Sequence, residues 1–270
     1  MLPVATAIRH LIQFTPDMDV QVVQSDGIST MLNVLDHEAQ PQGFSFASAP
    51  LLQLRCIECL HMLSFSGKCL DPLATQVTPY VKSAFQVVYK HLTKTDASTE
   101  GQLARITLQF LGNLCLVPAC VDNMVKGMDP VDLSTVLPTV WSGDPGEVQL
   151  LLCLHMIPLK RHTQAATQFA KASVNSQLAA TLLSLLSTLV PKSKLNESSQ
   201  TKSYAARFLS VLSSNPGSGG AIASLLVSSR VWETYGDSTQ GSTDDLRRLL
   251  VPPYAPALLK GDQANPHRIG

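Results

Sequence analysis

Two cysteines, Cys56 and Cys59, form a Cys-x-x-Cys motif that His61 and Cys69 follow. Thiolates at this spacing can bind zinc, but a zinc site needs four converging ligands, normally with a second ligand pair. No second pair follows, and both cysteines fall inside an apolar helical pattern. A thioredoxin-like motif would need a preceding strand, which the pattern does not predict. We therefore interpret these thiols as helix-packing residues and expect no metal site.

The histidines do not form a catalytic motif in the sequence. Six of them are scattered along the chain, at His10, His37, His61, His91, His155 and His162. None shares a local motif with a carboxylate or a nucleophile, and nothing resembles a nucleophile elbow. The glycine-rich segment 215–220 lacks the Lys-Ser/Thr of a phosphate-binding loop. We expect no catalytic residue, no cofactor and no enzymatic activity; a helical enzyme with a site assembled across repeats is the alternative.

Charge and hydropathy exclude several classes of partner. The chain carries 20 basic and 20 acidic residues, which argues against nucleic acid because phosphate binding needs a basic field. The longest apolar run, Leu178 to Val190, is too short to cross a bilayer, so we expect at most peripheral membrane association. No secretory signal follows Met1, and free cysteines inside apolar patterns indicate a reducing, cytoplasmic setting.

A short helical signature, apolar-x-x-Leu-x-x-apolar, recurs five times. It occurs at Ile8-Leu11-Phe14, Ile57-Leu60-Leu63, Leu108-Leu111-Leu114, Leu151-Leu154-Ile157 and Ala206-Leu209-Leu212. The central leucines are 49, 51, 43 and 55 residues apart, close to the period of roughly 40 to 47 of armadillo and HEAT arrays. Each unit exposes an apolar face that only its neighbours can cover. The sequence therefore predicts an all-α, armadillo/HEAT-like superhelical solenoid of about five three-helix repeats over residues 1–235.

The ends of the predicted third helices carry recognisable turn and cap residues. Gly27 suits a left-handed turn between the second and third helices of the first repeat. Asp129, before Pro130, and Asn175 are predicted N-caps. Loops are expected at 38–50, 93–101, 143–146 and 191–200, which are rich in Pro, Gly, Ser, Thr or charge. Residues 236–270 are predicted to form a flexible tail containing Pro, Gly and Ser.

The remaining candidate for function is the surface of the third helices. In an armadillo solenoid these helices line a concave face that binds extended segments of other proteins. The residues that we expect to bind partners are Asn33, Lys82, Gln86, Lys90, Ser184, Ser187, Trp232 and Tyr235. Their side chains are mixed and mostly neutral, so charge alone would not select the partner.

One segment resembles a known family. The run Ser224-Leu225-Leu226-Val227-Ser228-Ser229-Arg230-Val231-Trp232-Glu233-Thr234-Tyr235 resembles a segment near the end of the large endosomal J-domain proteins of receptor-mediated endocytosis (DnaJ homolog subfamily C). In that family the repeats end in a helix that carries Ser-Ser-x-Val-Trp-x-x-Tyr or a close variant. The resemblance covers residues 101–235, and the Val-Trp-x-x-Tyr segment is its specific part. After the tyrosine that family continues with a charged run ending in Asp-Leu-Phe, whereas this chain has Gly236 to Gln240. No His-Pro-Asp triplet of a J domain is present.

The resemblance implies a divergent or truncated C-terminal region of such a co-chaperone, without the capacity to stimulate a chaperone ATPase. It further implies a peripheral location on early endosomes, protein transport as the process, and endosomal coat or sorting proteins as partners. The alternative is an armadillo adaptor of cilia, centrosome or cytoskeleton that has no role in trafficking.

Overall fold

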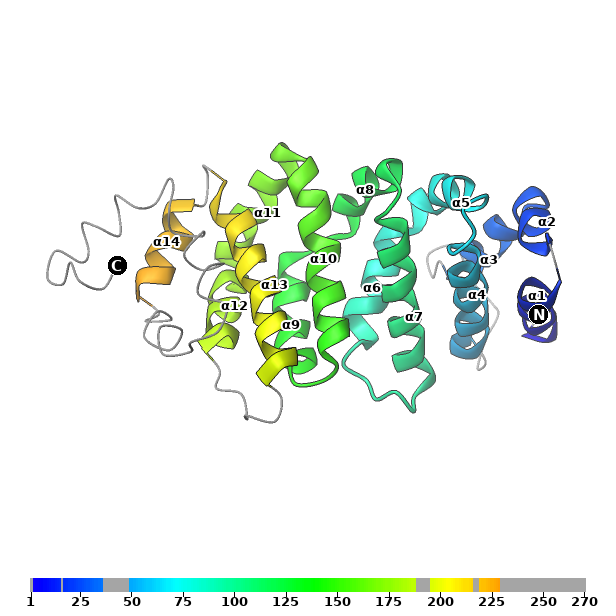
Figure 1. Ribbon diagram of the computed structural model, residues 1–270, viewed down its shortest axis with the longest axis horizontal. Helices are drawn as coiled ribbons and strands as arrows, with labels where there is room; N and C mark the ends of the chain where they lie inside the picture. The colour runs from blue at the N-terminus through cyan, green and yellow to red at the C-terminus, as the bar shows by residue number, and fades with distance from the viewer. Residues whose placement is uncertain (1, 16, 36–48, 188–194, 216–218, 229–270) are drawn as a thin grey trace, which may run out of the picture. The chain divides into compact units, whose positions relative to one another are not determined.

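The computed structural model describes residues 2–15, 17–35, 49–187, 195–215 and 219–228. Every regular element in these residues is a helix, which confirms the predicted all-α class (Figure 1). The chain divides into two compact units, Met1–Met128 (unit 1) and Asp129–Gly270 (unit 2). The described helices include none that is both long and apolar enough to cross a membrane.

Unit 1 contains three successive groups of helices. They are α1 (Leu2–Phe14), α2 (Met18–Gln24) and α3 (Gly27–Leu35); α4 (Ala49–Leu63), α5 (Leu70–Val77), the short 3₁₀ helix η2 (Thr78–Tyr80) and α6 (Val81–His91); and α7 (Thr99–Leu114), α8 (Pro118–Met124) and the 3₁₀ helix η3 (Val125–Gly127). Helix α4 packs against α1 and α3, and α7 packs against α4 and α6. The first helix of each group therefore lies beside the first helix of the next.

The recurring signature forms the core of unit 1 in α4 and α7. Ile57, Leu60 and Leu63 are at most 1% exposed, and the corresponding residues of α7 are equally buried. Each buried leucine contributes about 2 kcal/mol through the removal of its side chain from water. Helix α7 is capped by Ser98, whose side chain accepts a hydrogen bond from the Gly101 amide.

The turn before α3 differs from the prediction in one residue. The left-handed backbone conformation belongs to Asp26, with φ of 54°, and Gly27 is the first residue of α3. Gly27 is required for a different reason, because a Cβ atom there would lie 2.9 Å from both the carbonyl oxygen and the Cγ1 atom of Val22. The absence of a side chain at Gly27 lets α2 and α3 approach each other closely.

Unit 2 contains α9 (Pro130–Trp141), α10 (Pro145–Arg161), α11 (Thr163–Asn175), α12 (Leu178–Ser187), α13 (Leu195–Ser213) and α14 (Gly219–Ser228). Helix α10 packs against α13, and α9 packs against α12. The signature leucines Leu154 and Leu209 are at most 1% exposed. In this unit too, helices about 50 residues apart in sequence share one core.

The helix starts of unit 2 confirm one predicted cap and correct another. The Asp129 carboxylate accepts hydrogen bonds from the amides of Val131 and Asp132, as expected of an N-cap. The prediction for Asn175 was wrong, because this residue ends α11 and α12 begins only at Leu178. The loop predicted over 191–200 was also too long, since α13 begins at Leu195.

A candidate protein-binding surface

The predicted partner-binding residues of unit 1 are exposed on two neighbouring groups of helices. Lys82, Gln86 and Lys90 are spaced four residues apart on α6, so they follow one face of that helix, and all three are exposed. Asn33 is exposed on α3. The opposite face of α6 carries Val88, which is fully buried.

Side-chain hydrogen bonds join α3 of the first group to α5 and η2 of the second group. The Tyr80 hydroxyl donates to the Asn33 side-chain oxygen over 2.6 Å, and Ser29 donates to the Gln76 side-chain oxygen over 3.5 Å. Both pairs are 47 residues apart in sequence. The first bond lies directly at the predicted surface, and it fixes Asn33 of α3 relative to the start of α6.

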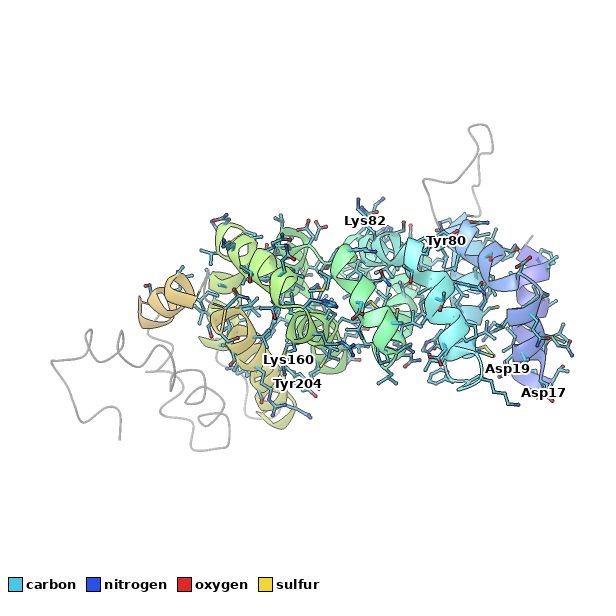
Figure 2. All side chains as sticks on the ribbon, turned by 90° about the horizontal axis from the view of Figure 1, so that it is seen from above. Asp17, Asp19, Tyr80, Lys82, Lys160 and Tyr204 are labelled. Atoms are coloured by element: carbon cyan, nitrogen blue, oxygen red, sulfur yellow. The ribbon has the colours of Figure 1, made fainter. Side chains whose placement is uncertain are left out.

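The two sides of unit 1 differ in charge. Helices α3 and α6 contain two lysines, Lys82 and Lys90, and no aspartate or glutamate. Figure 2 shows Tyr80 and Lys82 on one side of unit 1, and Asp17 and Asp19 on the opposite side. A hydrogen bond from Ser66 lowers the pKa of the Asp19 carboxyl, which keeps that side anionic. The α3 and α6 surface therefore offers ammonium and amide groups to a partner, suited to carboxylates and main-chain carbonyls.

The remaining predicted partner-binding residues belong to the second half of the chain, and the structure describes only some of them. Ser184 is exposed on α12. The side chain of Ser187, and Trp232 and Tyr235 altogether, lie outside the described residues.

Sequence reasoning missed exposed residues on α9. Val131 is 57% exposed, and Thr135 and Pro138 are exposed on the same helix. Pro138, inside the helix, was the available signal, because an interior proline leaves a carbonyl without its helical donor and is better tolerated where water can solvate that carbonyl.

The cysteines of the Cys-x-x-Cys motif lie within α4, as predicted, and are buried. Burial raises the pKa of the Cys56 thiol to about 12 and that of Cys59 to about 11. The Cys59 thiol faces the Ala5 carbonyl oxygen of α1 over 3.7 Å. These protonated thiols pack α4 against α1 and are poor nucleophiles or metal ligands, since both roles need the thiolate.

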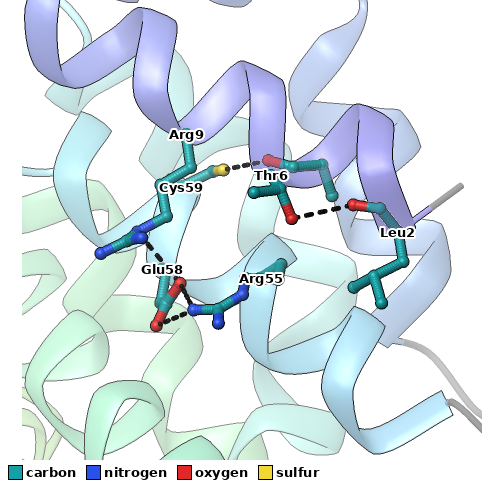
Figure 3. A network of polar contacts seen from close by, with 7 residues as sticks. Leu2, Thr6, Arg9, Arg55, Glu58 and Cys59 are labelled. Atoms are coloured by element: carbon teal, nitrogen blue, oxygen red, sulfur yellow. Dashed lines mark hydrogen bonds and ion pairs between the residues drawn. The ribbon is translucent and has the colours of Figure 1, made fainter.

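An ionic network near the same motif joins α1 to α4 (Figure 3). The Glu58 carboxylate lies 2.7 Å from the Arg55 guanidinium and 3.1 Å from Arg9 of α1. All three side chains are partly accessible to water, so we assign the network a modest role in setting the register of the helices.

Among the described residues, the histidine that is fully buried lies in unit 2. His155 of α10 is fully buried between Phe169 and Phe208, with ring centroids 6.1 Å and 6.2 Å away. Its Nδ1 atom lies 2.7 Å from the Leu151 carbonyl oxygen, which can only accept, so Nδ1 carries the proton. Burial lowers the pKa of this imidazole to about 4, and the ring is therefore neutral at pH 7.

Among the described side chains, no group of three or more His, Cys, Asp or Glu residues could hold a metal ion. Comparison of the chain with protein-family models, with curated proteins and with solved structures gave no match.

Proposed function

We propose that the chain is an armadillo-like solenoid of about five three-helix repeats that acts as a protein-binding scaffold. The support is a set of side-chain hydrogen bonds that join successive groups of helices. Besides the pair of Asn33 with Tyr80, Asn113 donates to Ser64 over 2.8 Å and Gln149 donates to Thr201 over 3.3 Å. The partners are 47, 49 and 52 residues apart, close to the intervals between the signature leucines.

The proposed binding surface is the face of α3 and α6 that carries Asn33, Lys82, Gln86 and Lys90. One observation carries this proposal: α3 and α6 carry exposed amide and ammonium groups, and the hydrogen bond from Tyr80 to Asn33 joins α3 to the 3₁₀ helix that leads into α6. An extended segment laid across both helices would offer its carbonyl groups to the amides and its carboxylates to the lysines.

We further propose that the partners belong to endosomal trafficking, among the coat or sorting proteins. Support for this part comes from the resemblance of the segment 228–235 to the endosomal J-domain family. In this proposal, the chain acts on the cytoplasmic side of early endosomes as a peripheral component. It binds no cofactor and catalyses no reaction.

Affinity purification of the full chain, with quantitative mass spectrometry, tests both parts. The test variant is the double substitution Lys82→Glu with Lys90→Glu. The matched control is Lys68→Glu with Lys94→Glu, which changes the net charge equally outside α3 and α6. We expect the wild type and the control to enrich endosomal coat or sorting proteins, and the test variant to lose at least about 90% of that enrichment, because each lysine replaced reverses a favourable contact.

The possible failures are distinguishable. Equal loss in the test variant and the control would remove the α3 and α6 surface from the proposal. Enrichment of cytoskeletal or ciliary proteins in place of endosomal ones would replace the trafficking role with the adaptor role. The scaffold function would be contradicted if the binding of no enriched protein depended on Lys82.

A further inference from the structure

The charges of this chain are segregated along the sequence. Residues 1–147 contain 14 acidic and 8 basic residues, a net charge of −6, whereas residues 148–228 contain 1 acidic and 7 basic residues, a net charge of +6. The neutrality of the whole chain therefore conceals a basic stretch that begins within α10 and runs to the end of α14. Charge asymmetry of this kind suggests an anionic partner. The acidic residue of the stretch is Glu197, whose side chain lies outside the described residues, and the basic residues are Lys160, Arg161, Lys171, Lys192, Lys194, Lys202 and Arg207.

Two of these cations come together on neighbouring helices of unit 2. Lys160 of α10 and Arg207 of α13 are both exposed, and the two helices pack against each other. The Arg207 guanidinium lies 5.8 Å from the centre of the Tyr204 ring, and Figure 2 shows Tyr204 and Lys160 on the same side of unit 2. Burial raises the pKa of the Cys153 thiol, and the charges of Lys160 and Arg207 both oppose that rise. Both cations therefore lie near the same thiol.

Apolar side chains lie among these cations. Ile157 of α10 is 37% exposed and precedes Lys160 by three residues. On α13, Val211 is partly exposed and follows Arg207 by four residues. Spacings of three and four residues place each pair on one face of its helix. We define the α10–α13 face by Ile157, Lys160, Tyr204, Arg207 and Val211.

We propose that the α10–α13 face binds the surface of an anionic phospholipid bilayer. Lys160 and Arg207 pair with the phosphate and carboxylate groups of the lipids, while Ile157 and Val211 enter the boundary between headgroups and acyl chains. The amphipathic ring of Tyr204 suits the same boundary. The long stems of lysine and arginine let both cations stay at the level of the headgroups as the helices approach.

The mixture of cations and exposed apolar side chains favours a bilayer over a soluble polyanion. Nucleic acid would pair with the cations but would offer only phosphates to Ile157 and Val211. An acidic peptide would need apolar residues at matching positions, whereas a bilayer offers both kinds of contact along its whole surface. Among the described side chains of α10 and α13, the one carboxylate is Glu147, which precedes Lys160 by 13 residues and so lies about 20 Å away along the helix.

The binding should be weak and sensitive to salt. Each cation at an anionic membrane surface strengthens binding by about fivefold, and this attraction is lost beyond a Debye length of about 10 Å. The inference goes beyond the protein-binding function proposed above and does not depend on it. The two surfaces also belong to different helices, so variants of one leave the other unchanged.

Co-sedimentation of the full chain with vesicles tests the electrostatic part. We expect the wild type to bind phosphatidylcholine vesicles that contain about 30% phosphatidylserine, to bind pure phosphatidylcholine far less, and to dissociate at high salt. The test variant, Lys160→Gln with Arg207→Gln, should bind at least about tenfold more weakly. The matched control, Lys82→Gln with Lys90→Gln, loses the same charge from α6 in unit 1 and should bind as the wild type does.

A second pair of variants tests the apolar part. Ile157→Ser should weaken binding severalfold, whereas Val131→Ser, on α9, removes a side chain that is 57% exposed and should leave binding unchanged. Ile157→Trp keeps the test decisive if the serine variant is less stable. This tryptophan should strengthen binding, and lipids brominated in their acyl chains should quench its fluorescence.

Three results would overturn the proposal. Equal binding to neutral and anionic vesicles would remove the role of the cations, as would anionic vesicle binding that Lys160→Gln with Arg207→Gln leaves unchanged. Failure to bind vesicles, together with binding of single-stranded DNA or a polyglutamate peptide that this variant loses, would assign the face to a soluble polyanion instead.

Discussion

Acidification should destabilise unit 2 through His155. The neutral ring is enclosed by Phe169 and Phe208 and donates to Leu151, so a second proton would place a charge in an apolar core. Its pKa is about 4 in the folded protein, against the usual 6.5. Because the folded pKa is the lower one, the unfolded chain binds the proton more readily at intermediate pH. The stabilisation is present above pH 6.5 and is lost as pH falls towards 4.

The difference between the two pKa values corresponds to about 3 kcal/mol, of which about 2 kcal/mol is lost between pH 7 and pH 5. Urea unfolding followed by tryptophan fluorescence measures this loss, since both tryptophans, Trp141 and Trp232, belong to unit 2. The control is His155→Gln, which cannot titrate. We expect this variant to be about 2 kcal/mol less stable at pH 7 because it loses ring packing.

The wild type should lose about 2 kcal/mol more than His155→Gln when the pH falls from 7 to 5. Subtraction of the two pH profiles removes the contribution of every other titrating group that the variants share. Identical pH profiles would refute the reasoning, because they would mean that the imidazole is protonated equally in the folded and unfolded states.

Three further outcomes follow from local packing. Asp129→Ala should lower the stability of unit 2 by about 1 kcal/mol in urea unfolding, because two amides at the start of α9 lose their acceptor; an unchanged midpoint would contradict the cap. Gly127→Ala should lower the melting temperature by several degrees, because a Cβ atom at this position collides with the ring of Phe85. A higher melting temperature would show that the ring moves aside at no cost. In native alkylation at pH 8 followed by peptide mass spectrometry, partly exposed Cys153 should react well before Cys56, and the reverse order would be inconsistent with the burial of the α4 thiols.

The helical class and the core were predictable because both depend on the spacing of apolar side chains. The leucines at positions 60, 111, 154 and 209 recur at intervals that place each one on the inner face of a long helix, and all four are buried. Periodicity of this kind is averaged over many residues, so single exceptions do not disturb it.

Turn details were less predictable because neighbouring residues compete for one conformation. Asp26 and Gly27 can both adopt a left-handed backbone, and the structure places it at Asp26, while Gly27 leaves space for Val22. Asn175 was misread for a similar reason, since asparagine is favoured at helix starts and also at helix ends. Such choices depend on contacts across the turn.

Only part of the candidate surface could be predicted from the sequence. The exposure of Lys82, Gln86 and Lys90 follows from their position opposite the buried Val88. The bond between Tyr80 and Asn33 does not, because it joins residues from two different groups of helices. The exposure of Leu11 and Phe14 could not be recognised either, because both belong to the same helical signature as the buried leucines.

Hydrogen–deuterium exchange tests the central claim most directly. The exchange is measured on the free chain and on its complex with a captured protein whose binding depends on Lys82. A scaffold that binds through its third helices predicts slower exchange in α3 and α6 upon binding, and unchanged exchange in α2, α5 and α8. Protection confined to α2, α5 and α8, with none in α3 or α6, would contradict the account.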